Sequence, residues 1–136
     1  LGREVGVVQA ADALGRARTL EPAWSELTEA AGAAKVYLYA KGADCDFRAR
    51  MFGPGDGVAE DPATGSASAI LAAQLLASGA LGKGETAFTL HQGVEMGRPS
   101  VIGLTACVAG GKLTEVRIAG SAVPVSDGRI TPPVTG

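Results

Sequence analysis

The stretch TGSASAILAAQLLAS, residues 64–78, is the longest apolar helix pattern in the chain and decides the fold. Its apolar residues lie almost all the way round the helix instead of along one stripe, and such a helix is normally buried on most sides. Its many small residues would let neighbouring strands approach the helix axis closely. Gly79 follows it and is a suitable C-terminal stop. We therefore expect a central helix that other elements enclose.

The segments on either side of this helix are predicted to be short strands. Before it, residues 35–40 and 46–52 alternate in polarity across a turn, which predicts a β-hairpin. After it, Gly110-Gly111 is a two-residue hairpin signal. The strand candidates of this second half are residues 86–91, 101–108, 112–118 and 122–125. The expected fold is α+β, with an antiparallel sheet, curled or closed into a barrel, around one buried central helix.

The N-terminal part is expected to add one strand and one helix. Residues 5–10 form a short apolar strand pattern, and residues 19–32 form a helix pattern. Trp24, Leu27 and Ala31 recur at helical spacing, so we expect them to face the core. Trp24 is interpreted as a core anchor and not as a ligand contact.

Length, composition and charge bound the class of protein. The chain has 136 residues, of which 46% are apolar, and this fits one globular domain better than a disordered chain. Its 20 glycines favour many turns and short strands. The formal net charge is -2 and the aromatic content is 4%, so neither a basic nucleic-acid surface nor a base-stacking platform is expected.

The two cysteines, Cys45 and Cys107, have neither metal-site spacing nor a CxxC arrangement. We interpret them as reduced thiols of a cytoplasmic protein and expect no metal site. No apolar run approaches the roughly 20 residues of a membrane span, and the first residues do not resemble a signal peptide. The chain starts with Leu instead of Met, which favours a fragment of a longer protein.

The segment EDPATGSA, residues 60–67, carries the candidate site. It opens the central helix, whose N-terminus offers unpaired N–H groups and a partial positive charge to a small anion. Gly65 lets a ligand approach the backbone, while Thr64 and Ser66 add hydroxyl donors. Asp61 is an acceptor that can hold an ammonium or hydroxyl group, or position a proton. The residue types alone fit plain helix capping equally well, with Asp61, Thr64 or Ser66 as the cap.

Three motifs together resemble the C-terminal half of the PhzF-like family of phenazine-biosynthesis-type isomerases. They are RMF at residues 50–52, EDPATGSA at 60–67 and QGVEMGRPS at 92–100, and their order and spacing match. The resemblance covers residues 36–129. Family members are similar to diaminopimelate epimerase in fold. They have two related lobes, each a curled sheet around a central helix, with the active site in the cleft between the lobes.

The resemblance makes the chain, residues 1–136, a single domain that corresponds to the C-terminal lobe. Residues 1–34 would be a lead-in from the inter-lobe region and 131–136 a tail. The intact two-lobed protein would be an enzyme, a cofactor-independent isomerase that transfers a proton within a small carboxylate-bearing metabolite. No metal or organic cofactor is implied. The family's acid/base Glu and a supporting His belong to the other lobe, so this chain alone is expected to be inactive.

The resemblance also gives roles to residues of this sequence. Asp61 and Ser66 match family positions that line the cleft and contact substrate, so they are the candidate catalytic residues. Gly65 and the adjacent backbone would meet the substrate's carboxylate, and Thr64 and Glu60 complete the substrate-binding set. The expected partners are therefore a small carboxylate-bearing substrate and a missing N-terminal lobe or partner chain.

Two other functions stay open at this point. A non-catalytic small-carboxylate-binding or scaffold domain would keep the pocket, and its uncovered face would drive assembly into a homodimer or larger oligomer. An amino-acid racemase or epimerase of the two-thiol type needs a Cys at the start of the central helix, where Thr64, Gly65 and Ser66 stand instead. His91 is interpreted as a structural residue, and Arg98 as a turn residue, with attraction of an anionic substrate as the alternative for Arg98.

Overall fold

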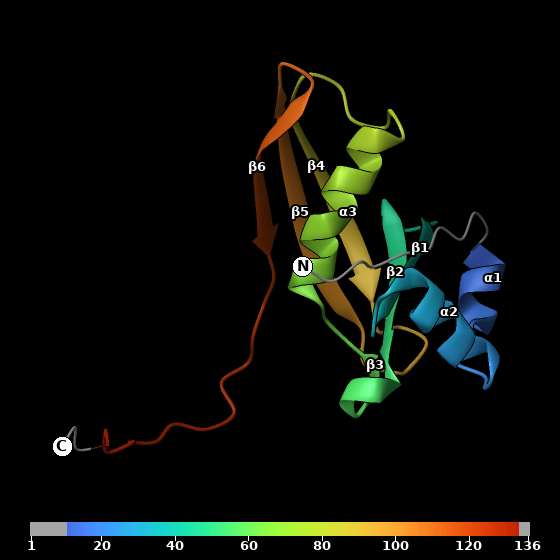
Figure 1. Ribbon diagram of the computed structural model, residues 1–136. Coiled ribbons are helices and arrows are strands. Elements are labelled where there is room, and N and C mark those ends of the chain that lie inside the picture. Colours follow the sequence, from blue (N-terminus) through green and yellow to red (C-terminus); the bar gives the residue numbers. More distant parts are fainter. Residues whose placement is uncertain (1–10, 134–136) are drawn as a thin grey trace.

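The computed structural model describes residues 11–133, so the strand predicted for residues 5–10 lies outside the described residues. Two helices open this part of the chain, and a third lies between two groups of strands (Figure 1). The elements are α1 (Ala11–Arg16), α2 (Ala23–Ala31), β1 (Val36–Lys41), β2 (Phe47–Gly53), the short 3-10 helix η1 (Pro54–Asp56), β3 (Val58–Asp61), α3 (Gly65–Ala77), β4 (Gly84–Gln92), β5 (Ser100–Ala109) and β6 (Lys112–Ala119).

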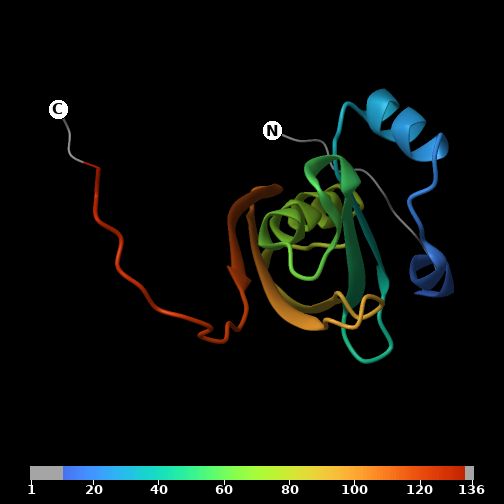
Figure 2. The same ribbon diagram turned by 90° about the horizontal axis from the view of Figure 1, so that it is seen from below.

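The strands form one curled sheet in the order β1-β2-β4-β5-β6, with β3 paired to β2 beside this path. The predicted α+β class is confirmed, but the sheet is mixed and not wholly antiparallel, because β2 and β4 run parallel. The reason is that α3 lies in the connection between them, and a crossover of this kind returns the chain in its original direction. The sheet curls round α3 without closing into a barrel (Figure 2).

The core lies between α3 and the concave face of the sheet (Figure 1). Ala67, Leu71, Ala72 and Leu75 are buried on the inner side of α3, as its composition predicts. The expectation that this helix is covered on most sides is wrong in part, because Ile70 on the opposite side remains 42% exposed. An open sheet can cover only one side of the helix, so an apolar stripe of α3 stays uncovered.

The convex face of β1 and β2 is covered by α1, whose Leu14 is fully buried. In contrast, α2 contributes no buried residue to the described structure. The expectation that Trp24, Leu27 and Ala31 face the core is wrong, since Leu27 is 47% exposed and the other two are only partly buried. With α3 on one face of the sheet and α1 on the other, α2 remains at the periphery (Figure 2).

The turn and tail predictions have opposite outcomes. The Gly110-Gly111 hairpin between β5 and β6 is confirmed, and both glycines have positive φ angles, 57° and 74°, as a tight hairpin turn requires. The strand predicted for residues 122–125 is wrong, because this segment pairs with no other strand and leaves the body of the domain (Figure 1). Val125 is 94% exposed there. Among the described helices, none has the length and apolar character needed to cross a membrane.

Candidate functional site

The four-residue strand β3 carries two neighbouring carboxylates, Glu60 and Asp61, whose side chains point to opposite faces of the sheet. It pairs with β2 so that Asp61 lies opposite Met51. Because successive side chains of a strand point to opposite faces, Asp61 shares the inner face with Met51 while Glu60 lies on the outer face with Arg50. The sequence interpretation treated both carboxylates as parts of one loop site, and the structure separates them.

Glu60 forms a bidentate ion pair with Arg50. Arg50 Nε donates to Glu60 Oε1 at 2.8 Å and Nη2 donates to Oε2 at 2.9 Å. Arg50 is 4% exposed, and its third nitrogen, Nη1, donates to the carbonyl oxygens of Leu14, Gly15 and Ala17 at the end of α1. The hydrogen-bonded Glu60 carboxylate raises the pKa of Arg50, so the guanidinium stays charged. These contacts give Glu60 a structural role, and its contact with substrate stays a prediction.

On the inner face, Asp61 is held by a network of hydrogen bonds that are mostly part-buried. Thr64 Oγ1 donates to Asp61 Oδ2 at 2.7 Å, and the Ala63 N–H donates to Oδ1 at 3.4 Å. Gln92 at the end of β4 is fully buried, and its Nε2 donates to Thr64 Oγ1 and to the Asp61 carbonyl, both at 2.8 Å. The Thr64 N–H donates in turn to Gln92 Oε1 at 3.3 Å. Gln92 therefore fixes the loop between β3 and α3.

The start of α3 is open to a ligand. Thr64 occupies the N-cap position without a side-chain hydrogen bond to the helix. Asp61 bonds to the Ala63 N–H, which lies ahead of the helix, and to the Thr64 hydroxyl. Ser66 is exposed in the first turn. The capping interpretation thus accounts for the loop but leaves the first helical N–H groups, with their partial positive charge, without a side-chain cap from Thr64.

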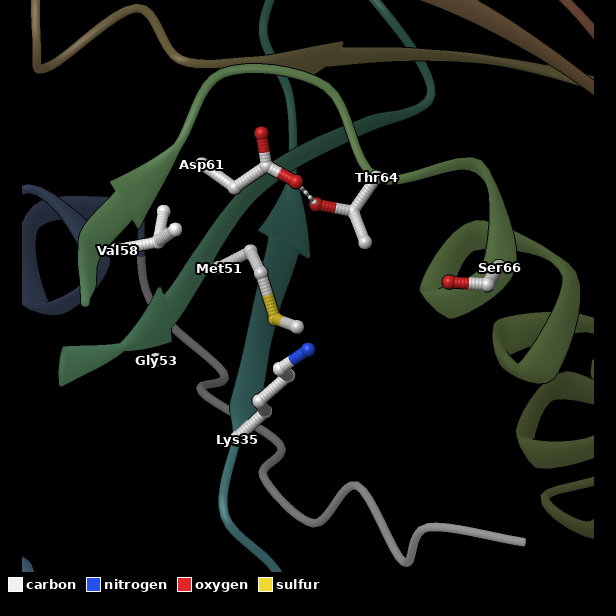
Figure 3. A pocket seen from close by; sticks show the side chains of 7 residues that line it. All are labelled: Lys35, Met51, Gly53, Val58, Asp61, Thr64 and Ser66. Atoms are coloured by element: carbon white, nitrogen blue, oxygen red, sulfur yellow. Dashed lines mark hydrogen bonds between the residues drawn. The ribbon is translucent and has the colours of Figure 1, made fainter. Parts of the chain in front are cut away.

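A pocket of about 340 Å³ lies between the start of α3, the strands β2 and β3, and Lys35, the residue before β1. Figure 3 shows Lys35 and Ser66 reaching toward it from different sides, with Asp61 and Thr64 joined by a hydrogen bond at its margin. Lys35 Nζ also lies 2.9 Å from Asp56 Oδ2. The residues that line the pocket are Lys35, Met51, Gly53, Val58, Asp61, Thr64 and Ser66.

This arrangement combines opposite charges in one small space. The ammonium group of Lys35 and the N-terminus of α3 favour an anion, whereas the Asp61 carboxylate favours a hydrogen-bond donor or a cation. Met51 and Val58 add apolar surface. The pocket is therefore suited to a small molecule that carries a carboxylate together with an amino or hydroxyl group.

Three of the five site residues predicted from the sequence line this pocket, namely Asp61, Thr64 and Ser66. Gly65 lies at the same helix end but does not line it. A Cβ added at Gly65 would meet Ile118 Cγ2 at an ordinary 3.5 Å, so sterics do not demand glycine there. Its contact with a substrate carboxylate stays a prediction.

The sequence interpretation missed Lys35 and Met51. Lys35 was assigned only to the start of a strand, and a single Lys at a strand end carries no signal of a pocket. Gln92 was quoted within the QGVEMGRPS motif without a role of its own. The position of Gln92 in this motif could have indicated its buried role, because a polar residue that ends an apolar strand pattern and precedes Gly93 needs buried hydrogen-bond partners.

Replacing Gln92 with Leu should lower the free energy of unfolding by about 1–3 kcal/mol, because the Asp61 carbonyl and the Thr64 N–H lose their buried partner. Urea denaturation followed by circular dichroism measures this loss. Gln74 is exposed on α3, so Gln74→Leu is the matched control and should change the free energy by no more than about 0.5 kcal/mol. Equal denaturation midpoints for the two variants would contradict the structural role of Gln92.

The α+β fold with a curled sheet over one helix matches part of solved PhzF-family and epimerase structures. The chain is similar to a phenazine biosynthesis protein of the PhzF family from Bacillus anthracis, with a TM-score of 0.69 and 21% identity over 85% of this chain and 40% of the other. It is also similar to a hydroxyproline epimerase from Agrobacterium vitis, with a TM-score of 0.54 and 24% identity over 81% of this chain and 33% of the other.

The chain belongs to the PhzC-PhzF family of phenazine biosynthesis-like proteins, whose sequence profile matches residues 6–128. It is 42% identical over 125 residues to an uncharacterized isomerase of Mesorhizobium japonicum, covering 88% of this chain and 41% of that protein. It is 43% identical over 89 residues to trans-2,3-dihydro-3-hydroxyanthranilate isomerase of Pseudomonas chlororaphis, covering 65% of this chain and 32% of that enzyme. The chain thus spans less than half the length of the curated relatives it matches.

Proposed function

We propose that this chain is the substrate-anchoring lobe of a PhzF-type isomerase. In the complete enzyme, a proton moves within a small carboxylate-bearing metabolite without a metal or organic cofactor. The observation that carries the proposal is the pocket in which Asp61, Thr64 and Ser66 meet the N-terminus of α3 and Lys35. Family membership supports the reaction class, and the pocket supports the chemistry of the substrate.

The substrate's carboxylate is placed at the start of α3. There the free N–H groups, the Ser66 hydroxyl and the Lys35 ammonium all favour negative charge, although Asp56 partly compensates Lys35. Asp61 lies on the other side of the pocket and accepts a hydrogen bond from the substrate's amino or hydroxyl group. Because Thr64 already holds one oxygen of Asp61, the carboxylate has a fixed direction and orients the substrate for proton transfer.

The proton carrier itself is proposed to be a Glu from the part of the protein that this chain does not contain. General acid–base catalysis needs a carrier within hydrogen-bond reach of the proton. The proton leaves one carbon of the substrate and returns to another carbon of the same molecule, so the substrate neither gains nor loses electrons. A reaction with that balance needs no redox partner, which agrees with a cofactor-independent mechanism.

The uncovered stripe of α3 supports a two-lobed arrangement. Ser66 and Ile70 are one helical turn apart, so the exposed apolar surface continues from the pocket. Apolar surface that borders a polar pocket is typical of a protein–protein or domain interface. We propose that the other lobe covers this stripe and closes the pocket, whether it belongs to the same polypeptide or to a partner chain. A homodimer through the same surface is the alternative assembly.

The test uses the complete polypeptide that contains this chain. Asp61→Asn should lower kcat for isomerisation of trans-2,3-dihydro-3-hydroxyanthranilate by about 100-fold, the order of effect expected when the residue that orients the substrate loses its negative charge. Incorporation of solvent deuterium into the substrate carbon should fall in parallel. Asp127 lies in the exposed tail, so Asp127→Asn is the matched control and should leave both rates unchanged.

The same experiment separates the competing functions. Full activity of Asp61→Asn would contradict the assigned role of this pocket. Saturable binding of small carboxylates by the complete wild-type polypeptide, with neither turnover nor deuterium incorporation, would favour the non-catalytic binding domain. A two-thiol racemase gains no support from the structure, since neither Cys45 nor Cys107 lines the pocket.

A further inference from the structure

We propose that Asp44, Cys45 and His91 form a binding site for a divalent transition-metal ion, with Zn²⁺ as the best match. The carboxylate, thiol and imidazole ligand atoms of these three residues all lie within 4.8 Å of one another. The Nδ1 atom of His91 is 3.5 Å from Asp44 Oδ2. This cluster was not visible in the sequence, because His91 lies on a strand far from the other two residues.

The sheet topology brings the three residues together. Asp44 and Cys45 lie in the turn that joins β1 to β2, while His91 lies near the end of β4. Since β2 and β4 pair in parallel with Arg48 opposite His91, the turn that precedes β2 falls beside the imidazole. Asp46 links the turn to β4, because its Oδ2 atom accepts a hydrogen bond from the Thr89 N–H at 2.7 Å.

The proposed metal site is separate from the substrate pocket. Gln92 points to the inner face of the sheet, where it holds Asp61 and Thr64. Its neighbour His91 therefore points to the outer face, since successive residues of a strand alternate. Val101, which lies opposite His91 on β5, is 61% exposed, in agreement with this direction. Metal binding is thus not expected to require substrate.

The thiol is held in place by the backbone around it. Cys45 Sγ donates to the Phe47 carbonyl at 3.1 Å. On its other side it packs against Gly42, where an added Cβ would lie only 2.4 Å from Sγ and 2.7 Å from the Cys45 carbonyl oxygen. Glycine at position 42 thus makes room for the sulfur.

The ligand set fits Zn²⁺ better than it fits hard cations. Zinc accepts thiolate, imidazole and carboxylate ligands together, whereas Mg²⁺ and Ca²⁺ prefer oxygen alone. With bonds of about 2.0–2.3 Å, tetrahedral zinc places its ligand atoms about 3.3–3.8 Å apart. The ligand atoms of the three residues lie up to 4.8 Å apart, so they must approach one another by about 1 Å to bind zinc. A movement of the exposed Asp44 side chain can provide this approach. Three protein ligands leave the fourth position to water.

The local charges also allow a dication. A thiolate and a carboxylate together neutralise the two positive charges of the ion. Arg48 is the cation beside His91 in the sheet register, but its Nη2 is paired with Glu95 Oε1 at 2.8 Å. Repulsion between Arg48 and a bound metal ion is therefore largely compensated.

Cobalt titration of the full chain tests the proposal. We expect one Co²⁺ per chain, with visible bands of tetrahedral cobalt and a near-ultraviolet thiolate-to-cobalt charge-transfer band. Cys45→Ser should abolish the charge-transfer band, and His91→Gln should weaken Co²⁺ affinity by at least about tenfold, the lower end of what a disturbed ligand shell costs. Competition with Zn²⁺ should displace the cobalt, because Zn²⁺ has no d-electron preference against a tetrahedral site with thiolate and imidazole ligands.

Cys107→Ser is the matched control. Cys107 is also near carboxylates, those of Glu85 and Glu115, but no imidazole joins it in any metal-ligand group of the described residues. This variant should keep the full cobalt spectrum. Absence of a charge-transfer band in the wild-type chain, or its loss in Cys107→Ser and not in Cys45→Ser, would overturn the assignment. Should Cys45→Ser fail to fold by circular dichroism, Asp44→Asn and His91→Gln decide the question by their Co²⁺ affinities.

Discussion

Replacing Arg50 with Met should lower the free energy of unfolding by about 3–5 kcal/mol, the usual cost of removing one partner of a buried ion pair. The Glu60 side chain is only 13% exposed, so its carboxylate cannot recover full hydration once the guanidinium is gone. The carbonyl oxygens of Leu14, Gly15 and Ala17 also lose their donor. Methionine keeps most of the apolar stem, so the loss reports mainly on charge and hydrogen bonds. Urea denaturation of the chain measures it.

Two further variants identify the cause of this loss. Arg98 is exposed, so Arg98→Met should change the free energy of unfolding by no more than about 0.5 kcal/mol. The double replacement Arg50→Met with Glu60→Leu removes the stranded charge and should recover part of the stability, since apolar substitutes for a buried ion pair are often tolerated. A denaturation midpoint for Arg50→Met equal to that of Arg98→Met would contradict the buried pair.

The main elements of the fold could be predicted from the sequence because they are set by local patterns. The apolar composition of α3 indicates a helix against the core, and the alternating residues of β1 and β2 indicate strands. The turn between β5 and β6 needs positive φ angles, which only glycine adopts at low cost, and Gly110 and Gly111 provide them. In each of these cases the deciding interaction lies within a few residues along the chain.

The unpredicted features depend on contacts between distant segments. The parallel pairing of β2 with β4 joins segments separated by α3, and no local pattern encodes it. β3 has only four residues, too few for strand periodicity to be visible, and so the opposite directions of Glu60 and Asp61 were missed. For α2, the spacing of Trp24 and Leu27 indicated an apolar face but not whether any element covers it.

The same distinction between local patterns and contacts of distant segments applies to the candidate site. Asp61, Thr64 and Ser66 lie within one motif, so their common location follows from the helix start alone. Lys35 immediately precedes β1 and Gln92 ends β4, so their roles depend on how the sheet is assembled. The backbone contact that joins the loop after β4 to the Asp61 loop is a third feature of this kind, and it occurs at Gly93.

Gly93→Ala should destabilise the chain by roughly 2–5 kcal/mol, the sum of left-handed backbone strain and steric overpacking. Gly93 has a φ angle of +76°, and a Cβ there would lie 2.4 Å from the Arg98 carbonyl oxygen and 2.9 Å from Pro62 Cα. Both obstacles are backbone atoms, so no side-chain rotation relieves the clash. One of the two loops must move, and the loop that contains Pro62 also carries Asp61 and Thr64.

This movement should impair function as well as stability. In the complete polypeptide, Gly93→Ala should lower kcat/KM about 100-fold, because a displacement near 1 Å in a positioning residue has an effect of that order. Gly97→Ala is the matched control, since Gly97 has a similar φ angle of +74° but no atom within 4 Å of an added Cβ. Gly97→Ala should lose only the strain, about 1–2 kcal/mol, and should keep its activity. If both variants unfold at the same urea concentration, the close contact between the loops does not hold the pocket together, and the position of Asp61 depends on its hydrogen bonds with Thr64 and Gln92 instead.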